Sequence, residues 1–201
     1  MLLNFDETYI LENEKIRLEP LQEAHLEHLK HFPIEEPEIW KYSLMQINDV
    51  DSLQRYIQIA LENRKAKKEY AFAVFDKLKQ QYAGSTRFYD IQLENRMLQL
   101  GFTWYGKSFQ GTHVNRNCKY LLLEFAFEQL NNERVEFRAD YRNEKSIQAM
   151  MKIGCVKEGI MRSHADCADG TRRTSVILSI LKDEWHSSVK NNLLNSLQKY
   201  D

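Results

Sequence analysis

One stretch near the middle of the chain has the residue types of an anion-binding loop. The segment GKSFQGTHVNRN runs from Gly106 to Asn117 and leads into a long amphipathic stretch. A helix that begins here would present unbonded backbone N–H groups and the positive end of its dipole, which together bind phosphates. Small or polar side chains surround this start: Gln110, Gly111, Thr112 and Asn115. His113, however, stands where a phosphate loop would favour another glycine, so this stretch taken alone favours an ordinary loop and helix start.

A second strand-to-helix junction follows along the chain. RVEFRAD (Arg134–Asp140) alternates apolar and charged residues as a strand does, and it leads into YRNEKS. Asn143 is a good helix N-cap, and Ser146 falls in the first helical turn. Two neighbouring junctions of this kind can hold one elongated ligand between them. We therefore expect the two segments to form a single site.

The remaining pattern gives the elements that must position these residues. Alternation predicts strands at 15–20, 70–75, 84–90, 97–104, 134–140, 155–161 and 171–181. Apolar residues at three- and four-residue steps predict helices at 21–32, 49–68, 114–130, 143–153 and 183–200. Two prolines predict a loop at 31–40. Four apolar residues of strand 97–104 are expected on one face: Leu98, Leu100, Phe102 and Trp104.

This order favours an α/β (α+β) fold, with a mixed sheet and helices on both faces. The chain has 201 residues with only 7 Gly and 3 Pro, and no linker is visible. We therefore expect one domain over residues 1–201. The net charge of −1 argues against general attraction to nucleic acid or to an anionic membrane.

The sequence also bears on the compartment and on metals. No apolar run reaches the ~20 residues of a membrane helix, and the acidic N-terminal residues are unlike a signal peptide. Three cysteines lack CxxC spacing, which fits a reduced, cytoplasmic setting. Cys118 falls on the apolar helix face and is expected in the core. The histidines at 25, 28 and 31, and the pair His164 and Cys167, show no complete ligand set, so no metal is expected.

Three segments together resemble a known family. WYGKSFQGTHVNRNCKYLLLEFAFEQL, RVEFRADYRNEKSIQAMMKIGCVKEGIMR and DGTRRTSVILSILKDEW are similar to the GNAT superfamily of N-acetyltransferases, and within it to the Rim-type branch, named for acetylation of ribosomal-protein N-termini. The likeness runs from about Lys15 to Trp185. It is most specific in the R-N-x-x-S helix start and the glycine that follows the helix, Gly154.

The resemblance implies a splayed, mixed sheet with acetyl-CoA between strands 97–104 and 134–140. Backbone groups of Phe102, Thr103 and Trp104 would pair with the pantetheine arm. The family's Q/R-x-x-G-x-G/A loop maps onto Gln110, His113 and Asn115, of which only Gln110 keeps the pattern. The implied cofactor contacts are these residues with Gly111, Thr112, Val114, Asn143 and Ser146. Because backbone N–H groups would face the pyrophosphate, the two departures weaken the motif without abolishing the site.

The implied reaction is direct acetyl transfer from acetyl-CoA to a primary amine, either a protein N-terminus or a small molecule. A strand N–H near Trp104 would meet the oxyanion. Ser146 would donate to the leaving thiolate, with Tyr141 as the alternative donor. The base is not specified, and the candidates are Glu69, Asp140, Glu158 or a water molecule.

Several questions about partners stay open at this stage. Aromatic residues of 32–42, 88–89 and 104–105 are expected on the acceptor side, where Glu35, Glu36 and Glu38 would attract a cationic amine. A homodimer is compatible with the sequence. The competing interpretation is a non-catalytic acyl-CoA-binding or interaction module on the same fold. A nucleotide-binding protein is disfavoured because neither GxxxxGK[ST] nor GxGxxG occurs.

Overall fold

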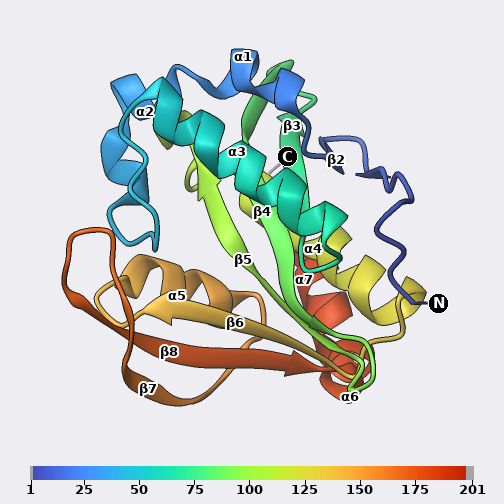
Figure 1. Cartoon of the computed structure of the whole chain (residues 1–201). Coiled ribbons are helices and arrows are strands. Elements are labelled where there is room, and N and C mark those ends of the chain that lie inside the picture. Colours follow the sequence, from blue (N-terminus) through green and yellow to red (C-terminus); the bar gives the residue numbers. More distant parts are fainter. Residues whose placement is uncertain (1, 198–201) are drawn as a thin grey trace.

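A single bent sheet organises the molecule (Figure 1), and the computed structural model describes residues 2–197 of the chain. Its strands lie in the order β1-β2-β3-β4-β5-β6-β8-β7, and the described neighbours are antiparallel except for β5 and β6. The strand bounds are β1 Leu11–Glu12, β2 Ile16–Pro20, β3 Tyr70–Asp76, β4 Gln81–Gln92, β5 Met97–Tyr105, β6 Arg134–Asp140, β7 Val156–Asp166 and β8 Arg172–Leu181. This is the mixed α/β architecture expected from the sequence.

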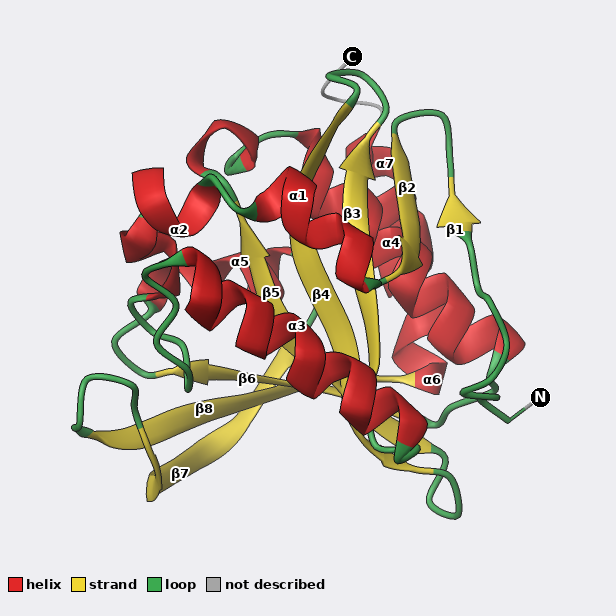
Figure 2. Ribbon diagram, turned by 45° about the horizontal axis from the view of Figure 1, so that its top comes forward, coloured by secondary structure: helices red, strands yellow, loops and turns green. Residues whose placement is uncertain are grey.

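Helices cover both faces of the sheet. In Figure 2, α1, α2 and α3 lie in front of it, while α4 and α7 lie behind. The α-helices are α1 Leu26–Leu29, α2 Phe32–Glu35, α3 Val50–Lys65, α4 His113–Glu124, α5 Glu144–Lys152, α6 Lys182–Glu184 and α7 Lys190–Leu197. Short 3₁₀ turns occur at Glu23–His25, Pro37–Trp40 and Lys107–Phe109, and π-helical turns at Phe125–Gln129 and Trp185–Val189.

The long helices begin where the capping residues indicate. Asp49 accepts from the backbone N–H of Ser52 at the start of α3, and Ser52 Oγ in turn accepts from the Asp49 N–H. Thr112 caps α4 and Asn143 caps α5. The apolar side of α4 is buried and includes Cys118, as expected. Local capping and periodicity therefore suffice for these three elements.

Other boundaries differ from the sequence prediction. The single helix expected at 21–32 is broken into short turns, and helical turns continue into the segment expected to be a loop. Pro33 and Pro37 each stand in the first turn of a new short helix, where a missing N–H costs nothing. Strands β4 and β7 are longer than expected. The terminal helix is confirmed as a series of turns up to Leu197, and the end predicted for it at 198–200 lies outside the described residues.

The sheet opens between its two parallel strands. Strands β5 and β6 pair over only three positions, Met97 with Arg134, Leu98 with Val135 and Gln99 with Glu136. Beyond Gln99 they diverge, as Figure 1 shows, so the facing edges of both strands lose their partners. Unpaired strand edges are ready to hydrogen-bond an extended ligand.

A β-bulge in β5 redirects its side chains. The pairing with β4 shifts between Ser85 opposite Trp104 and Arg87 opposite Gly101, and Phe102 has φ of +48°. The extra residue reverses the alternation. Leu98 and Leu100 therefore do not share a face with Phe102 and Trp104, and the one-face prediction was wrong. Phe102 and Trp104 point toward α3 and the 3₁₀ turn at Pro37–Trp40, where they meet the rings of Tyr89 and Trp40.

Candidate active site

A cavity of about 430 Å³ lies in the opening between β5 and β6. One side of its wall comes from the segments after those strands: Gln110, Gly111, Asn115, Lys119, Asn143, Lys145 and Ser146. The other side comes from the segment after the Pro37–Trp40 turn, from β4 and from β8: Tyr42, Ser43, Leu44, Tyr89 and Arg173. The cavity therefore joins two chemically different faces through the opened sheet. The two strand-to-helix junctions thus line one cavity, and that they bind one ligand stays a prediction.

The start of α4 has the form of an anion site. Thr112 Oγ1 accepts from the Val114 N–H (3.3 Å) and donates to the Phe109 carbonyl (2.7 Å), so this hydroxyl serves as a cap. Gly111 adopts φ of +75°, which glycine alone accepts without strain, and a Cβ there would meet open space. Gly111 and Asn115, on either side of the helix start, line the cavity, so the α4 start borders it.

The imidazole of His113 is committed elsewhere. Its Nε2 lies 3.2 Å from Oδ1 of the buried Asp76 at the end of β3. His113 is the first residue of α4 and lies outside the cavity wall, as do Thr112 and Val114. The side chain therefore anchors the loop to the sheet, and what His113 can offer a ligand at the helix start is its backbone N–H.

A side-chain bridge connects the two junctions. Gln110 donates from Nε2 to the Tyr105 carbonyl (2.9 Å) and accepts from Lys145 Nζ (2.8 Å). Gln110 thus ties the end of β5 to the first turn of α5. Lys145 was not singled out from the sequence, although it stands inside the R-N-E-K-S motif, and it brings an exposed ammonium to the end of the cavity near the α4 start.

The first turn of α5 presents one free hydroxyl. Asn143 Oδ1 accepts from the Ser146 N–H at 3.1 Å, which fixes the helix start. Ser146 lines the cavity, and within the described part of the chain its Oγ makes no hydrogen bond. Tyr141, the alternative donor, is 56% exposed and lies off the cavity wall. The arrangement favours Ser146 over Tyr141 as a group that can reach a ligand.

Lys119 is a cavity residue that sequence reasoning missed. Its side chain is 5% exposed, and its Nζ donates to Thr103 Oγ1 (3.0 Å) and lies 5.7 Å from the centre of the Phe137 ring. The ammonium therefore bridges β5 and β6 beyond the point where their pairing ends. Burial lowers the pKa of Lys119 to about 8. A lysine on an apolar helix face was the available signal, because such a position carries a charge only at a cost.

None of the proposed carboxylate bases is free. Glu158 lies off the cavity wall in an ion pair with Arg134, which lowers its pKa. Glu69 also lies off the wall, 2.7 Å from the buried Arg87. Asp140 does line the cavity. Burial acts to raise its pKa, but hydrogen bonds from Arg142 outweigh burial and hold the pKa below its usual value.

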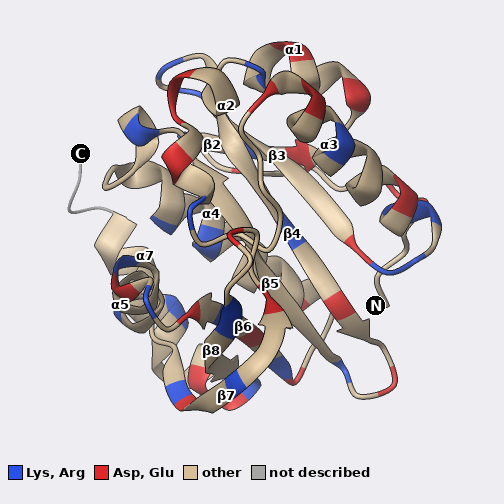
Figure 3. Ribbon diagram, turned by 60° about the vertical axis from the view of Figure 1, so that its left-hand side comes forward, with Lys and Arg blue, Asp and Glu red and all other residues tan. Residues whose placement is uncertain are grey.

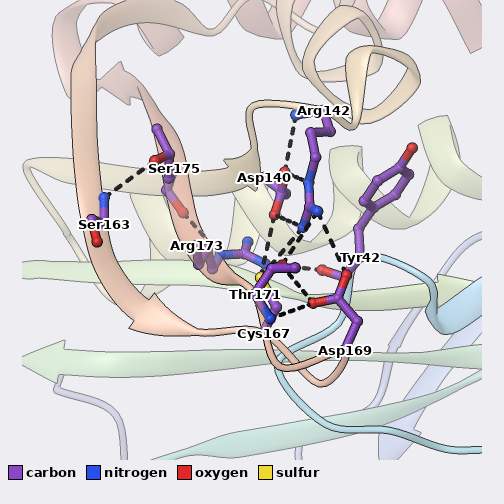
Figure 4. Close-up of polar contacts among 10 residues, drawn as sticks. Tyr42, Asp140, Arg142, Ser163, Cys167, Asp169, Thr171, Arg173 and Ser175 are labelled. Atoms are coloured by element: carbon purple, nitrogen blue, oxygen red, sulfur yellow. Dashed lines mark hydrogen bonds and ion pairs between the residues drawn. The ribbon is translucent and has the colours of Figure 1, made fainter.

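The Asp140 carboxylate belongs to a network at the end of β6 (Figure 4). Arg142 donates to it from Nε and Nη2, each at 2.9 Å, and the Cys167 thiol lies 3.6 Å from Oδ2. Arg142 also reaches Asp169 in the β7–β8 turn. These contacts identify Asp140 as an anchor for the turn rather than an available proton acceptor.

The face expected to receive the acceptor is aromatic, with some differences from the sequence prediction. The Trp104 ring packs at 4.7 Å from Trp40 and 5.6 Å from Phe32. Phe88 instead points to the opposite face and stacks on Phe125. The acidic loop is the segment 31–40 that carries Glu35, Glu36 and Glu38. Two of its carboxylates are already engaged, since Glu36 accepts from the Lys107 N–H (2.6 Å) and Glu38 pairs with the Lys107 ammonium. The loop is therefore held down on the segment after β5.

Histidines of the group at 25, 28 and 31 have local partners. His25 Nε2 lies 3.0 Å from Glu19, and His28 packs on the Tyr82 ring. Among residues 2–197 there is no group of three or more His, Cys, Asp and Glu side chains that could hold a metal ion. No described helix is long and apolar enough to cross a membrane. Figure 3 shows acidic and basic residues interspersed over the molecule.

Comparison with known proteins decides the family. The model of the acetyltransferase (GNAT) domain matches residues 15–156. The chain belongs to the GNAT family of acetyltransferases. This confirms the resemblance noted in the sequence and identifies the protein as an N-acetyltransferase.

Individual relatives of this GNAT protein agree. "Putative ribosomal N-acetyltransferase YdaF" of Bacillus subtilis is 31% identical over 102 residues, which are 51% of this chain and 55% of that protein. The chain thus spans about half the length of this relative. A solved structure named "putative acetyltransferase", from T. thermophilus, is 33% identical, with a TM-score of 0.85, 94% of this chain and 96% of that chain covered.

A more distant structure supports the fold. Mycobacterium smegmatis RimJ in complex with CoA-disulfide is 15% identical, with a TM-score of 0.76 over 94% of this chain and 93% of that chain. At this identity the likeness shows that the two chains share a fold.

Proposed function

We propose that this GNAT protein transfers an acetyl group from acetyl-CoA directly to a primary amine, and that the preferred amine is a peptide α-amino group. The observation that carries the proposal is the opening of β5 from β6, with a 430 Å³ cavity between the strands and the α4 start at one end. The name of YdaF, a putative ribosomal N-acetyltransferase, is consistent with an amine of a ribosomal protein as the acceptor.

The residues at the cavity fit acetyl-CoA. The backbone N–H groups at the α4 start, apart from that of Val114, which already donates to Thr112, suit the pyrophosphate together with the Lys145 ammonium. The free edge of β5 at Phe102–Trp104 suits the amide-bearing pantetheine arm, which can pair as an added strand. Acetyl-CoA supplies the activated thioester; the rest of the chemistry falls to the chain.

Two side chains on the cavity wall, those of Lys119 and Ser146, are placed to stabilise the negative charge that develops during acetyl transfer. The Lys119 ammonium lies beside Thr103 and can stabilise charge near the thioester. The Ser146 hydroxyl, free on the same wall, can donate a proton or a hydrogen bond to the departing sulfur. The thiolate of CoA leaves as the amide bond forms, and the amine loses its proton to water.

A peptide α-amino group is favoured as the acceptor because, among the described residues, no carboxylate on the cavity wall is free to act as a base. The two carboxylates on the cavity wall, Glu38 and Asp140, are ion-paired. An amine must then arrive neutral. An α-amino group has a pKa near ~8 and a lysine amine near ~10.4, so at pH 7 the neutral α-amine is more abundant by a factor of roughly 200 or more. A peptide N-terminus therefore needs no dedicated base.

The test is acetyl transfer itself. Purified protein with acetyl-CoA and peptides that begin with Ser or Ala should release free CoA thiol and yield N-acetylated peptide by mass spectrometry. Ser146→Ala should lower kcat by about 10- to 100-fold with little change in CoA affinity, while Tyr141→Phe should leave kcat within about twofold. Failure of calorimetry to detect CoA at millimolar concentration would falsify the proposal.

A further inference from the structure

The charges at the cavity are not balanced. Its carboxylates, Glu38 and Asp140, each have a cationic partner outside the wall, Lys107 and Arg142. Its cations are Lys119, Lys145, Arg138 and Arg173. Within the described part of the chain, only Arg138 of these four forms an ion pair with a carboxylate, that of Glu136, at 2.8 Å. The cavity is thus built to receive negative charge.

CoA accounts for only part of this excess. Lys145 stands at the α4 start, where the phosphates are proposed to bind, and Lys119 stands beside Thr103 on the α4 side of the sheet. Arg173 belongs to the other face. It comes from β8 and donates from Nη1 to the Tyr42 carbonyl (2.9 Å), in the segment between the Pro37–Trp40 turn and α3. A cation here faces the acceptor side.

Arg173 is held in place but not neutralised by direct contact. Its Nε donates to Ser175 Oγ at 2.9 Å, so both of its hydrogen-bond acceptors are uncharged (Figure 4). The side chain is 8% exposed, and within residues 2–197 no carboxylate lies within 4.0 Å of it; Asp140 acts on it only at longer range and is already bound by Arg142. A buried guanidinium without a direct counter-ion is costly, and such a cost is commonly recovered when an anionic ligand completes the pair.

The surroundings of Arg173 suit an amine that carries an acidic group. Tyr89 lies on the same wall with its ring over Gly101, where a Cβ would come within 2.9 Å of that ring. Arg138 lines the cavity close by, and both arginines act electrostatically on Tyr89. A carboxylate at Arg173 would leave an amine a few atoms away free to point into the opening between β5 and β6.

We propose that Arg173, assisted by Arg138, binds a carboxylate of the acceptor close to its reactive amine. The inference rests on the acetyltransferase function proposed above and adds a carboxylate to its acceptor, which is either a peptide or a free amino acid. A planar guanidinium matches a carboxylate with two parallel hydrogen bonds, which fixes orientation as well as affinity. The carboxylate belongs either to an acidic residue in the second position of a peptide or to the α-carboxylate of a free amino acid. Both place the acid near the amine, in contrast to the cationic acceptor expected from the acidic loop.

The experiment compares matched acceptors on the full-length protein. Three peptides, identical except for Glu, Gln or Lys in the second position, and a set of free L-amino acids are tested with acetyl-CoA. If the carboxylate comes from a peptide, the Glu peptide should exceed the Gln peptide in kcat/KM by about tenfold, and the Lys peptide should be poorest. If it is an α-carboxylate, free amino acids should be acetylated and their amides should not.

Variants identify the side chain. Arg173→Met should abolish the preference for the acidic acceptor, mainly through KM, and Arg173→Lys should restore part of it. Arg172→Met is the matched control, because its neighbouring guanidinium is exposed and paired with Asp166; this variant should keep the preference. If Arg173→Met does not fold, as judged by its thermal transition, Arg138→Met carries the same test with a smaller expected loss of about threefold.

The opposing outcomes are distinct. Equal rates with the Glu, Gln and Lys peptides, a preference for the Lys peptide, or a preference that survives both arginine substitutions would overturn the inference. So would transfer to no acidic acceptor while CoA binding is intact. Absence of CoA binding as well would overturn the proposed acetyltransferase reaction, which separates the two failures.

Discussion

At the scale of single residues, buried charges carry most of the functional information. Lys119, Arg173 and Asp140 are each almost fully buried, yet among the described residues only Asp140 has an ionic partner in direct contact. An unpaired buried cation destabilises the folded state. In a cavity, however, the same cation can bind an anionic ligand. The buried unpaired cations are therefore the residues on which the proposals for both substrates depend.

The first prediction concerns Lys119 and stability. We expect Lys119→Met to raise the free energy of unfolding at pH 7 by up to about 3 kcal/mol, since burial lowers the pKa of Lys119 to about 8 from an ordinary value near 10.4. Between these values the unfolded chain binds the proton and the folded chain does not, so wild-type stability should rise with pH. Urea unfolding from pH 7 to 10 should show that the difference in free energy of unfolding between the wild type and the variant becomes smaller.

The same substitution should harm catalysis. Loss of the ammonium beside Thr103 should lower kcat by about 10- to 100-fold, although the protein has become more stable. The wild-type rate should also decline above about pH 8 as Lys119 loses its proton, and this decline should be missing in the variant. A variant that is stabilised and fully active would show that the ammonium has no part in the reaction.

The second prediction concerns His113. Because its ring contacts Asp76 and lies off the cavity wall, we expect His113→Ala to leave the Kd for CoA within about threefold. The free energy of unfolding should fall by about 1–2 kcal/mol, since the buried Asp76 loses a hydrogen-bond partner. Calorimetry and urea unfolding measure the two quantities. A large loss of CoA affinity would mean that the imidazole itself contacts the ligand.

At the scale of elements, the sequence revealed what depends on local patterns. Asn143 could be recognised as a helix start because capping acts over three residues. The bulge at Phe102 could not, because a reversal of side-chain alternation depends on how β5 pairs with β4. Lys119 escaped notice for a related reason, since its meaning depends on the gap between two strands.

The same distinction applies to the candidate site. The R-N-E-K-S motif located Asn143 and Ser146 correctly at the start of α5, and the loop motif located Gln110 and Asn115 on the cavity wall. Glu158 and Glu69 are engaged by partners distant in sequence, Arg134 and Arg87, whereas Asp140 is engaged by Arg142, two residues along the chain. Sequence alone lists carboxylates; tertiary pairing shows which are available.

The third prediction tests the junction between α4 and α5. Lys145 brings a positive charge to Gln110, at the proposed phosphate position. We expect Lys145→Met to weaken CoA binding by about three- to tenfold and to make it less sensitive to added salt, because a screened charge contributes less as ionic strength rises. Lys152→Met at the far end of the same helix is the matched control and should change neither quantity. If both variants weaken CoA binding equally, the lost affinity reflects the overall charge of the protein and not the position of Lys145.

At the scale of the whole molecule, the sheet forms two arms joined weakly across the opening. The arm of β1–β5 and the arm of β6–β8–β7 share only three paired positions, and the cavity lies between them. A ligand that bridges the arms should therefore contribute strongly to stability, because it binds the folded form alone.

The fourth prediction follows from this arrangement. CoA at 100 times its Kd should raise the free energy of unfolding by about 2.7 kcal/mol, and for a chain of this size that corresponds to a rise in Tm of about 5–10 °C. Pantetheine at the same concentration should give a much smaller rise, because it lacks the phosphates that the α4 start and Lys145 are placed to bind. Scanning calorimetry of the protein with CoA and with pantetheine measures the two rises in Tm. Equal shifts would place the main contacts along the open edge of β5, and no shift with CoA would contradict binding across the arms.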